Sequence, residues 1–543
     1  MSSQALVSHS PPVQPGKATI AALTGGRIDE ARLARLLQHV TIAPGVPETP
    51  PLEVRIPFTG EILGHIPHGT ERDVAMAVTR ARAAQPDWAA KSFAERAGVF
   101  LRFHDMLLDR QDEILDLIQL ESGKARAHAF EEVADTAVVA RYYAHHAEEL
   151  LHVRHRRGAL PGLTATIERH HPVGVVGFMV PWNYPLNLAV TDAIPALMAG
   201  NTAVLRPDRQ TSFTALWAVD LLLEAGLPPN VLTLVTGEGP ELGPALVGAV
   251  DFVMFTGSTR TGKIIAQQAA PRLIGYSLEL GGKNPMLVLA DADLDGAIDG
   301  AVRGCFVGAG QVCVSIERIF VHASLFDAFL ERFATRAAAL RMSATLDYDA
   351  EMGSLTSVRQ LHTVVRHVND ALEKGATLHA GGRARRDIGP LFFEATILTG
   401  VRADMLLHDE ETFGPVVAVY PFADEDDAIA RANATRYGLN ASVFTRDTRH
   451  GVRVASRLQA GTVNVNEVYA AAWGSVDAPI GGFKESGVSR RHGREGILKY
   501  TEAQTIAVQR LIPVSGPRAF GAARAARFLT MALRLLKRTP GLR

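Results

Sequence analysis

From residue 173 onward, short apolar runs rich in β-branched side chains alternate with longer segments in which apolar residues recur every three or four positions. The short runs predict buried strands, and the longer segments predict amphipathic helices. We expect strands at 173–180, 202–206, 232–235, 251–255, 285–289 and 318–321, and helices at 212–225, 261–270 and 325–340. Because this alternation is typical of a parallel sheet covered by helices, the predicted fold class is α/β.

Two further regions complete the expected organisation. Residues 71–151 have a helical pattern almost throughout and should pack against the sheet, and a second α/β block should run from about 290 to 462. Residues 1–17 are polar and contain three prolines, without the charged and then apolar order of a secretory signal. We therefore expect the chain to begin with a disordered extension.

Composition narrows the class of protein. A chain of 543 residues exceeds the size of one core, and roughly 150 residues per domain predicts about three domains. A net charge of −1 argues against nucleic-acid binding. The two cysteines form no C-x-x-C pair, which favours a reducing compartment such as the cytoplasm. We expect no metal site, because no histidines have a zinc-ligand spacing, and no membrane span.

One cysteine stands in a context that suggests catalysis. Cys313 follows a glycine-containing turn at Gly310, and Glu279 lies upstream in the sequence Glu-Leu-Gly-Gly-Lys. A free thiol has a pKa of about 8.5, so a nucleophilic cysteine needs a polar site or a nearby base, for which Glu279 is the candidate. The alternative is a buried structural cysteine, the role that we assign to Cys305.

An asparagine at the end of a strand is a second candidate. Asn183 lies in Pro181-Trp182-Asn183-Tyr184-Pro185, directly after the expected strand 173–180. Ligands bind at the carboxyl ends of strands in open α/β sheets, where an amide could donate to a developing oxyanion. The alternative is a turn asparagine that satisfies local backbone groups.

Two glycine clusters could approach a phosphate. The segment 255–263 follows a strand and opens a helix, where free backbone N–H groups favour an anion. It nearly matches a nucleotide P-loop, but Ile264 replaces the hydroxyl that would hold Mg²⁺, which disfavours kinase or ATPase chemistry. The second cluster is Gly237-Glu238-Gly239 with Gly243. A plain tight turn remains the alternative for both.

Taken in order, these motifs resemble the aldehyde dehydrogenase family over about residues 50–510, with Glu411-Thr412-Phe413-Gly414-Pro415 as the last of them. Among its members the chain is most similar to bacterial NADP⁺-dependent succinate-semialdehyde dehydrogenases. The resemblance implies a Rossmann-type dinucleotide-binding domain at 49–154 and 171–289, a catalytic α/β domain at 290–498 and an oligomerisation β-arm at 155–170 and 499–512. An N-terminal extension, 1–48, and a C-terminal tail, 513–543, would flank them.

The resemblance also implies the chemistry. Cys313 would attack the aldehyde carbonyl, Asn183 and the Cys313 N–H would hold the oxyanion, and Glu279 would activate water to hydrolyse the thioester. Implied cofactor contacts are Pro181, Trp182, Arg206, Asp208, Arg209, Gly237, Gly243, Thr256, Gly257, Ser258, Gly262, Leu280, Gly281, Glu411 and Phe413. Two other classes remain open, a catalytically silent binding protein of the same fold and a thiol esterase.

One departure from the family pattern concerns the cofactor. Where the family has Lys-Pro-x-Glu, this chain has Arg206-Pro207-Asp208-Arg209. Loss of the glutamate removes a carboxylate that would repel a 2′-phosphate, and arginine binds phosphate through a fork of donors. We therefore expect NADP⁺ to be preferred, with NAD⁺ as the alternative. An exposed arginine pair without a role is the competing interpretation.

Other departures concern the substrate. Arginines that clamp a substrate carboxylate in the similar enzymes are replaced here by Thr191-Asp192 and Val307, although Ser475 matches a serine of that pocket. Trp182 and Trp473 could line an apolar tunnel. Succinate semialdehyde or a related aldehyde is the expected substrate, and a broad range of aliphatic or aromatic aldehydes is the alternative. The Gly-Arg-Glu of a possible proton relay is replaced by Ser489-Arg490-Arg491.

The C-terminal tail predicts an additional contact. Arginines and lysines from Arg524 to Arg538 fall on one side of a helical wheel, opposite Phe528, Leu529, Ala532 and Leu536. A basic amphipathic helix can lie on an anionic membrane or dock on a neighbouring subunit. The implied β-arm predicts a homodimer or homotetramer in the cytoplasm, and for the tail both peripheral membrane contact and docking on a neighbouring subunit stay open.

Overall fold

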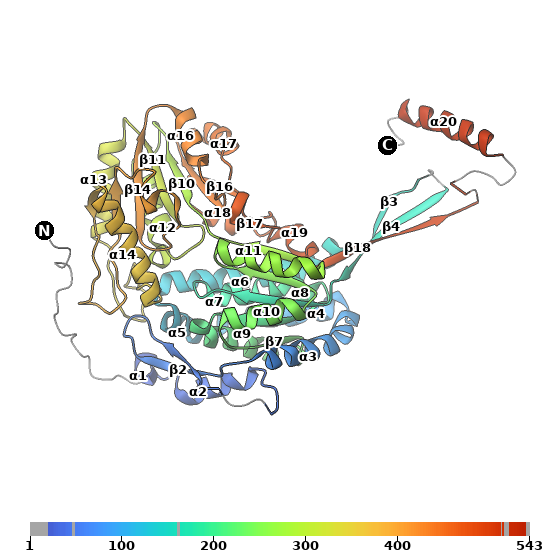
Figure 1. The fold of residues 1–543 in the computed structure, drawn as a ribbon, viewed down its shortest axis with the longest axis horizontal. Coiled ribbons are helices and arrows are strands. Elements are labelled where there is room, and N and C mark those ends of the chain that lie inside the picture. The colour runs from blue at the N-terminus through green and yellow to red at the C-terminus, as the bar shows by residue number, and fades with distance from the viewer. Residues whose placement is uncertain (1–19, 46–48, 160–162, 512, 515–520, 539–543) are drawn as a thin grey trace.

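The computed structural model describes residues 20–45, 49–159, 163–511, 513–514 and 521–538. Its described part contains two large sheets, a three-stranded arm that projects from the body, and a short β1 (Leu52–Arg55) and β2 (Ile62–Ile66) hairpin (Figure 1). The expected disorder of residues 1–17 lies outside the described residues. Residues from α1 (Ile20–Leu23) and α2 (Glu30–Leu36) onward pack on the body, with Leu33 and Leu36 buried.

The first sheet has six strands. Their order is β17 (Gly487–Val488), β9 (Gly275–Glu279), β8 (Phe252–Thr256), β5 (Val175–Val180), β6 (Thr202–Pro207) and β7 (Leu232–Leu234). All neighbours are parallel except β17, which runs antiparallel to β9. All six residues of β5 are buried because helices cover both faces, which explains its unbroken apolar run.

Alternate residues of these strands face two separate helical layers. Val175 and Met179 of β5 pack in one core with α3 (Glu71–Ala90), α10 (Gly239–Ala249) and α11 (Thr259–Ala269). Val176 and Phe178 pack in another core on the opposite face. This second core takes in α4 (Phe93–Asp109), α5 (Gln111–Ser122), α6 (Arg126–Leu151), α7 (Pro185–Val190), α8 (Ala193–Met198) and α9 (Ser212–Glu224). The period of two along a strand thus assigns each side chain to its layer.

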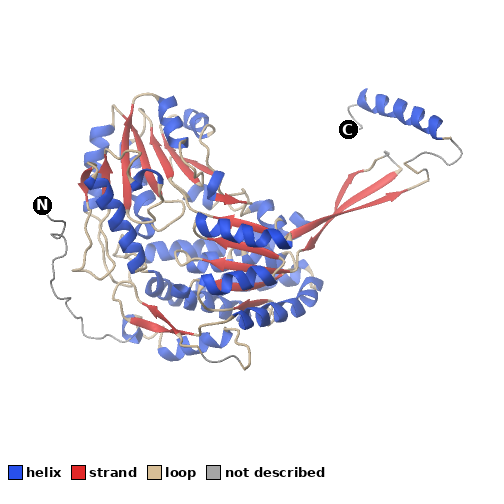
Figure 2. Cartoon of the chain, viewed as in Figure 1, coloured by secondary structure: helices blue, strands red, loops and turns tan. Residues whose placement is uncertain are grey.

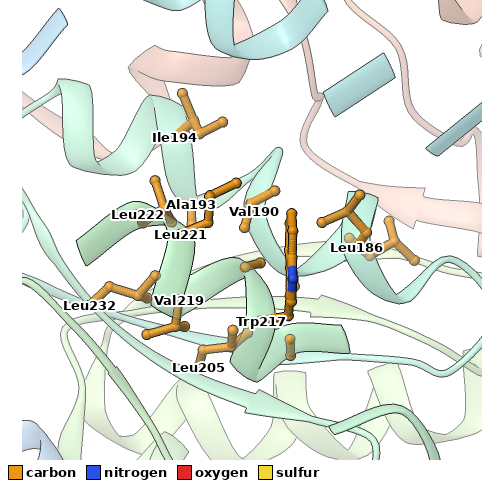
Figure 3. Packing of buried hydrophobic residues seen from close by; sticks show 14 of the residues in the cluster. Leu186, Val190, Ala193, Ile194, Leu205, Trp217, Val219, Leu221, Leu222 and Leu232 are labelled. Atoms are coloured by element: carbon orange, nitrogen blue, oxygen red, sulfur yellow. The ribbon is translucent and has the colours of Figure 1, made fainter. Parts of the chain in front are cut away.

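The second core is built around a buried tryptophan. Trp217 of α9 lies among Leu186 and Val190 of α7 and near Leu205 of β6 (Figure 3). This packing fixes α7, which begins two residues after Asn183. The core therefore supports the turn that carries the predicted amide donor.

The second large sheet has seven strands. Their order is β12 (Thr377–Ala380), β13 (Thr396–Thr399), β14 (Val416–Phe422), β11 (Ile316–His322), β10 (Asn284–Val288), β15 (Asn440–Phe444) and β16 (Thr462–Val465), with only the β12–β13 pair antiparallel. Its principal helices are α12 (Leu294–Phe306), α13 (Phe326–Ala338), α14 (Val358–Glu373), α16 (Glu425–Asn433) and α17 (Thr448–Ala455) (Figure 2). Short helices α15 (Leu406–Asp409), α18 (Ala470–Trp473) and α19 (Gly493–Leu498) lie in the loops.

The structure corrects two sequence-based assignments. The expected strand 285–289 was grouped with the first domain, but β10 belongs to the second sheet, because the chain leaves the first sheet at Gly281-Gly282. The strand β9 was not expected at all, although it ends on Glu279. Strand β17, which comes late in the chain, forms the edge of the first sheet, where Gly487 pairs with Glu279.

The arm and the tail extend away from the body. Strands β3 (Arg154–Arg157), β4 (Thr164–Pro172) and β18 (Thr501–Gln509) form an antiparallel sheet, and α20 (Ala522–Arg538) lies beside its far end (Figure 1). No residue of α20 is buried. Within the described residues, none of the helices combines the length and apolar character that a bilayer span requires.

Candidate active site

The turn before Cys313 is built from a left-handed stretch of backbone. Gly308, Ala309 and Gly310 have φ values of 56°, 55° and 72°. A Cβ on Gly310 would come 2.1 Å from the Gly414 carbonyl oxygen, so only glycine fits there. Asn284 then donates its side-chain amide to the Cys313 carbonyl at 2.8 Å and to the Ser315 carbonyl at 2.7 Å. These contacts fix the backbone that presents the half-buried thiol.

Asn183 reaches this turn from the other sheet. Its side chain is buried and donates from Nδ2 to the Gln311 carbonyl at 3.0 Å, two residues from Cys313. The Asn183 carbonyl accepts a bond of 2.5 Å from Lys124 Nζ, which also pairs with Glu132 Oε1 at 2.6 Å. Glu132 in turn accepts from the backbone N–H groups of Leu186 and Asn187 at the start of α7. A buried ion pair thus holds the turn that carries the amide.

Glu279 is a buried carboxyl at the end of β9. Among the described residues, no hydrogen-bond donor meets its buried Oε1. Burial raises the pKa of Glu279 to about 7, although the cations of Arg491 and Lys499 oppose that rise. A carboxyl with a pKa near neutrality can serve as a general base.

The thiol lies in the electrostatic field of two carboxyl groups. Burial first, and then the charges of Glu279 and Glu411, raise the pKa of Cys313 to about 12. The cysteine is therefore a neutral thiol in the resting site, and it must lose its proton before it attacks.

The segment from Glu411 to Phe413 lies beside the chain that follows β9. Glu411 Oε1 accepts from Gly282 N–H at 2.8 Å, and a Cβ on Gly281 would come 2.3 Å from Glu411 Oε2. Burial raises the pKa of Glu411 to about 8. Phe413 packs its ring edge-on against Trp182, with centroids 5.5 Å apart.

A buried carboxylate sets the backbone of this segment. Glu317 accepts from the backbone N–H groups of Thr412 and Phe413 at 3.0 Å and pairs with Lys283 at 2.5 Å. Phe413 is held at a φ of 54°, a conformation that side chains rarely adopt. Strain of this kind persists only where surrounding contacts impose it.

The predicted phosphate-binding residues lie at the carboxyl edge of the first sheet. Ser258 caps α11 by accepting from Thr261 N–H at 3.3 Å, and Thr256 and Gly257 lead into that helix. A Cβ on Gly262 would come 2.6 Å from Leu280, which explains the close approach of α11 to the chain after β9. The free N–H groups at the start of α11 suit an anion.

The two arginines of the cofactor segment differ in environment. Arg206 is half-buried, and its Nη2 donates to the Gly237 carbonyl at 3.2 Å while its Nε is buried without a partner among the described residues. Arg209 Nη1 lies 2.9 Å from Glu238 Oε1, in an exposed ion pair. Donors at Arg206, Arg209 and the start of α11 fit a phosphate-bearing dinucleotide, so the residues present suit the implied cofactor.

Other predicted residues lie in less direct positions. Gly243 lies within α10, where a Cβ would come 3.7 Å from the Met179 sulfur, and Asp208 caps the Gln210 N–H at 3.0 Å. Ser475 is exposed and donates to the Ala471 carbonyl at 2.7 Å. Trp473 lies beside Arg491, whose guanidinium is 5.2 Å from its ring centroid. Pro181 directly follows β5 and begins the Asn183 turn.

Several site residues had no signal in the sequence. Lys124 and Glu132 support the turn that carries Asn183, and Glu317 supports the segment that carries Phe413, while Asp192 and Lys499 form an ion pair that acts on Glu279. Apart from Lys124 and Glu132, which are eight residues apart, their ion-pair partners are distant in sequence, so no local spacing indicates those contacts. Within the described part of the chain, no group of three or more histidine, cysteine or acidic side chains is arranged to hold a metal ion.

Comparison with known proteins gives a family match, a similar sequence and two similar solved structures. A model described as the aldehyde dehydrogenase family matches residues 46–506. A Mycolicibacterium smegmatis protein, provisionally named succinate-semialdehyde dehydrogenase (NADP⁺), is 49% identical over 484 residues, covering 89% of this chain and 94% of its own. Among solved structures, the NAD⁺ complex of a Bacillus cereus aldehyde dehydrogenase superposes with a TM-score of 0.82 at 34% identity, covering 89% of this chain and 99% of that one. An Escherichia coli NADP-dependent enzyme has a TM-score of 0.83 at 34% identity, with 88% and 99% covered.

Proposed function

The chain belongs to the aldehyde dehydrogenase family, and from that premise we propose that it oxidises succinate semialdehyde or a related aldehyde to the free acid, with NADP⁺ as the preferred cofactor. It is an oxidoreductase that acts on the aldehyde group. Cys313 is the proposed nucleophile, Asn183 the oxyanion donor and Glu279 the base. The observation that supports this assignment is that the Asn183 amide donates to the Gln311 carbonyl at 3.0 Å, two residues before Cys313, while the Glu279 carboxyl acts electrostatically on the Cys313 thiol.

The geometry supports a different chemical role for each of these residues. The Asn183 amide and the Cys313 N–H would donate to the oxygen that becomes negative when sulfur adds to the carbonyl carbon. A bound nicotinamide dinucleotide would accept the carbon-bound hydrogen with its electron pair, and Arg206, Ser258, Glu411 and Phe413 are the proposed residues that hold it. Glu279 would then take a proton from the water that attacks the thioester, releasing the acid and the thiol.

The substrate assignment rests mainly on the names of similar proteins. The Mycolicibacterium smegmatis protein and others like it carry the name of an enzyme that acts on succinate semialdehyde. At one position where the similar enzymes have an arginine that binds the substrate carboxylate, this chain has Asp192, which is paired with Arg491 and Lys499. Asp192 supplies no positive charge to a substrate carboxylate. A broad range of neutral aldehydes is therefore retained as the second candidate.

The substrate test compares aldehydes that differ in charge. We expect kcat/KM for succinate semialdehyde to exceed that for butanal, which has the same number of carbons and no carboxylate, by at least tenfold. Reduced-cofactor absorbance measures both. Cys313→Ala should abolish turnover of every aldehyde, with Cys305→Ala as the matched control that retains it. Equal values for the two aldehydes would favour the broad-specificity candidate, and turnover by Cys313→Ala would exclude covalent catalysis at that sulfur.

Assembly and location belong to the same proposal. We infer that the β3–β4–β18 arm joins subunits into a homodimer or homotetramer, because its β18 is exposed along eight of nine residues. We infer a cytoplasmic location from the two free cysteines. The basic helix α20 would add contact with an anionic membrane surface, since Phe528 and Leu533 are 57% and 58% exposed on a helix that carries Arg524, Arg527 and Arg534.

A further inference from the structure

A cluster of buried charges lies beside Glu279. Arg491 Nε is 2.9 Å from Asp192 Oδ2, and Arg491 Nη2 donates to Thr191 Oγ1 at 2.7 Å. Lys499 Nζ is 3.1 Å from Asp192 Oδ1 and donates to Ser277 Oγ at 3.3 Å. The side chains of Arg491, Asp192 and Lys499 are only 3%, 4% and 5% exposed. These three residues are called the buried charge cluster.

The cluster is tied to the strand that carries Glu279. Ser277, which accepts from Lys499, lies two residues before Glu279, so the two side chains point to the same face of β9. The segment 480–491 also lies against the Glu279 carboxyl group. Arg491 pairs through its backbone with Ile480, and the next residue, Gly481, would place a Cβ 3.2 Å from Glu279 Oε1.

The charges of the cluster do not balance. Two cations face one carboxylate, so one positive charge remains in a region with little water. A buried charge without compensation is unfavourable, and besides Asp192 the carboxyl groups that act on Arg491 are those of Glu279 and, more weakly, Asp135. The charge of Asp192 also raises the pKa of Glu279, and that of Arg490 lowers it.

We propose that Arg491 and Lys499 are positioning residues that favour the ionised form of Glu279 against the effect of its burial, by supplying a buried positive charge that Asp192 neutralises only in part. The proposal rests on Glu279 acting as the base of the proposed reaction. Arg491 stands where the family pattern has a glutamate. Under this proposal its role is to supply a fixed positive charge at that place. In agreement, Arg491 and Lys499 are the leading charges that lower the pKa of Glu279 against the effect of burial.

The test measures the ionisation of Glu279 directly. In the resting full-length enzyme, an infrared band of the protonated carboxyl group should titrate near pH 7, and its absence in Glu279→Gln assigns it. In Arg491→Met the midpoint should rise by at least one pH unit, because the protonated form gains when the cation is lost. Arg491→Lys should restore it. An unchanged midpoint in a folded Arg491→Met protein would overturn the proposal.

A kinetic profile supplies the second measurement. Base-limited turnover of the wild type should rise with pH through about 7, since only the ionised carboxyl accepts a proton. Arg491→Met should lose about fivefold at pH 7, where the wild-type carboxyl is already half ionised, and recover at higher pH, as expected for a shift of one unit. Loss by the same factor at every pH would indicate a merely structural role and overturn the proposal.

Separate controls distinguish a folding defect of the variant from a failure of the proposed function. If Arg491→Met does not fold, as judged by circular dichroism, Lys499→Met must show the same upward shift in the infrared midpoint. A downward or absent shift there contradicts the proposal. Because the infrared titration needs no turnover, it stands even if the wild type oxidises no aldehyde, a result that would defeat only the proposed function.

Discussion

At the scale of single residues, the site combines groups whose environments oppose their charged forms. Cys313 and Glu279 are both shifted toward the protonated state by burial, with pKa values raised to about 12 and about 7. Near pH 7 the resting site therefore holds a neutral thiol beside a partly ionised carboxyl group. Such a thiol is protected from indiscriminate oxidation, because the thiolate is the reactive form.

The cofactor prediction also belongs to single residues. If Arg209 binds a 2′-phosphate, Arg209→Ala should lower kcat/KM for NADP⁺ about tenfold and change that for NAD⁺ little, since one charge-assisted contact contributes about 1.5 kcal/mol or more. Steady-state kinetics with each cofactor measure the ratio.

The matched variant for this prediction is Glu238→Gln. It removes the carboxylate that lies 2.9 Å from Arg209 and should increase the preference for NADP⁺. A ratio that neither variant alters would assign the Arg209–Glu238 pair to the surface without a role in cofactor choice.

At the scale of elements, the site depends on buried ion pairs that join helices to turns. Lys124, just before α6, and Glu132, within it, hold the backbone between β5 and α7 where Asn183 lies. Both side chains are nearly inaccessible, at 3% and 0%. Removal of one partner leaves the other charge buried without compensation.

Lys124→Met should therefore destabilise the protein by about 3–5 kcal/mol, as measured by urea unfolding. It should also lower kcat, because the Asn183 carbonyl loses its donor. The double variant Lys124→Met, Glu132→Gln should recover much of the stability, since a neutral amide keeps an acceptor for Leu186 and Asn187 N–H. If kcat recovered fully with stability, the pair would serve the fold alone and not the position of Asn183.

At the scale of the whole molecule, both large sheets contribute residues to the candidate site. The carboxyl edge of the first sheet supplies Asn183 and Glu279, while the loop before β11 of the second supplies Cys313. The arm and α20 lie away from this site (Figure 1). Changes to the tail should thus leave the chemistry intact.

We expect a chain that ends at residue 514 to retain kcat and its oligomeric state while losing sedimentation with phosphatidylserine vesicles. The binding of the full chain should weaken with salt, because exposed charges are screened. Phosphatidylcholine vesicles are the lipid control, and replacement of Arg524, Arg527 and Arg534 by glutamine is the protein control. Dissociation of the truncated chain into smaller species would instead assign α20 to a subunit contact.

The sequence alone determined the class of fold, the family and the central motifs. Runs such as 175–180 are apolar throughout because helices cover both faces of the sheet, and that burial leaves a readable pattern. The family prediction was confirmed by the match over residues 46–506. The strands at 202–207 and 252–256 appeared within one residue of the expected bounds for the same reason.

Only the tertiary structure decided which charges act on those motifs. The sequence marked Glu279, Cys313 and Arg491 separately, but Arg491 meets Asp192 and the β17 segment meets β9 only after the chain has folded back on itself. Electrostatic effects depend on distance and burial, and neither is encoded in local periodicity. For this reason motif order indicated the proposed nucleophile and the proposed base, whereas folding determined how readily each one holds a proton.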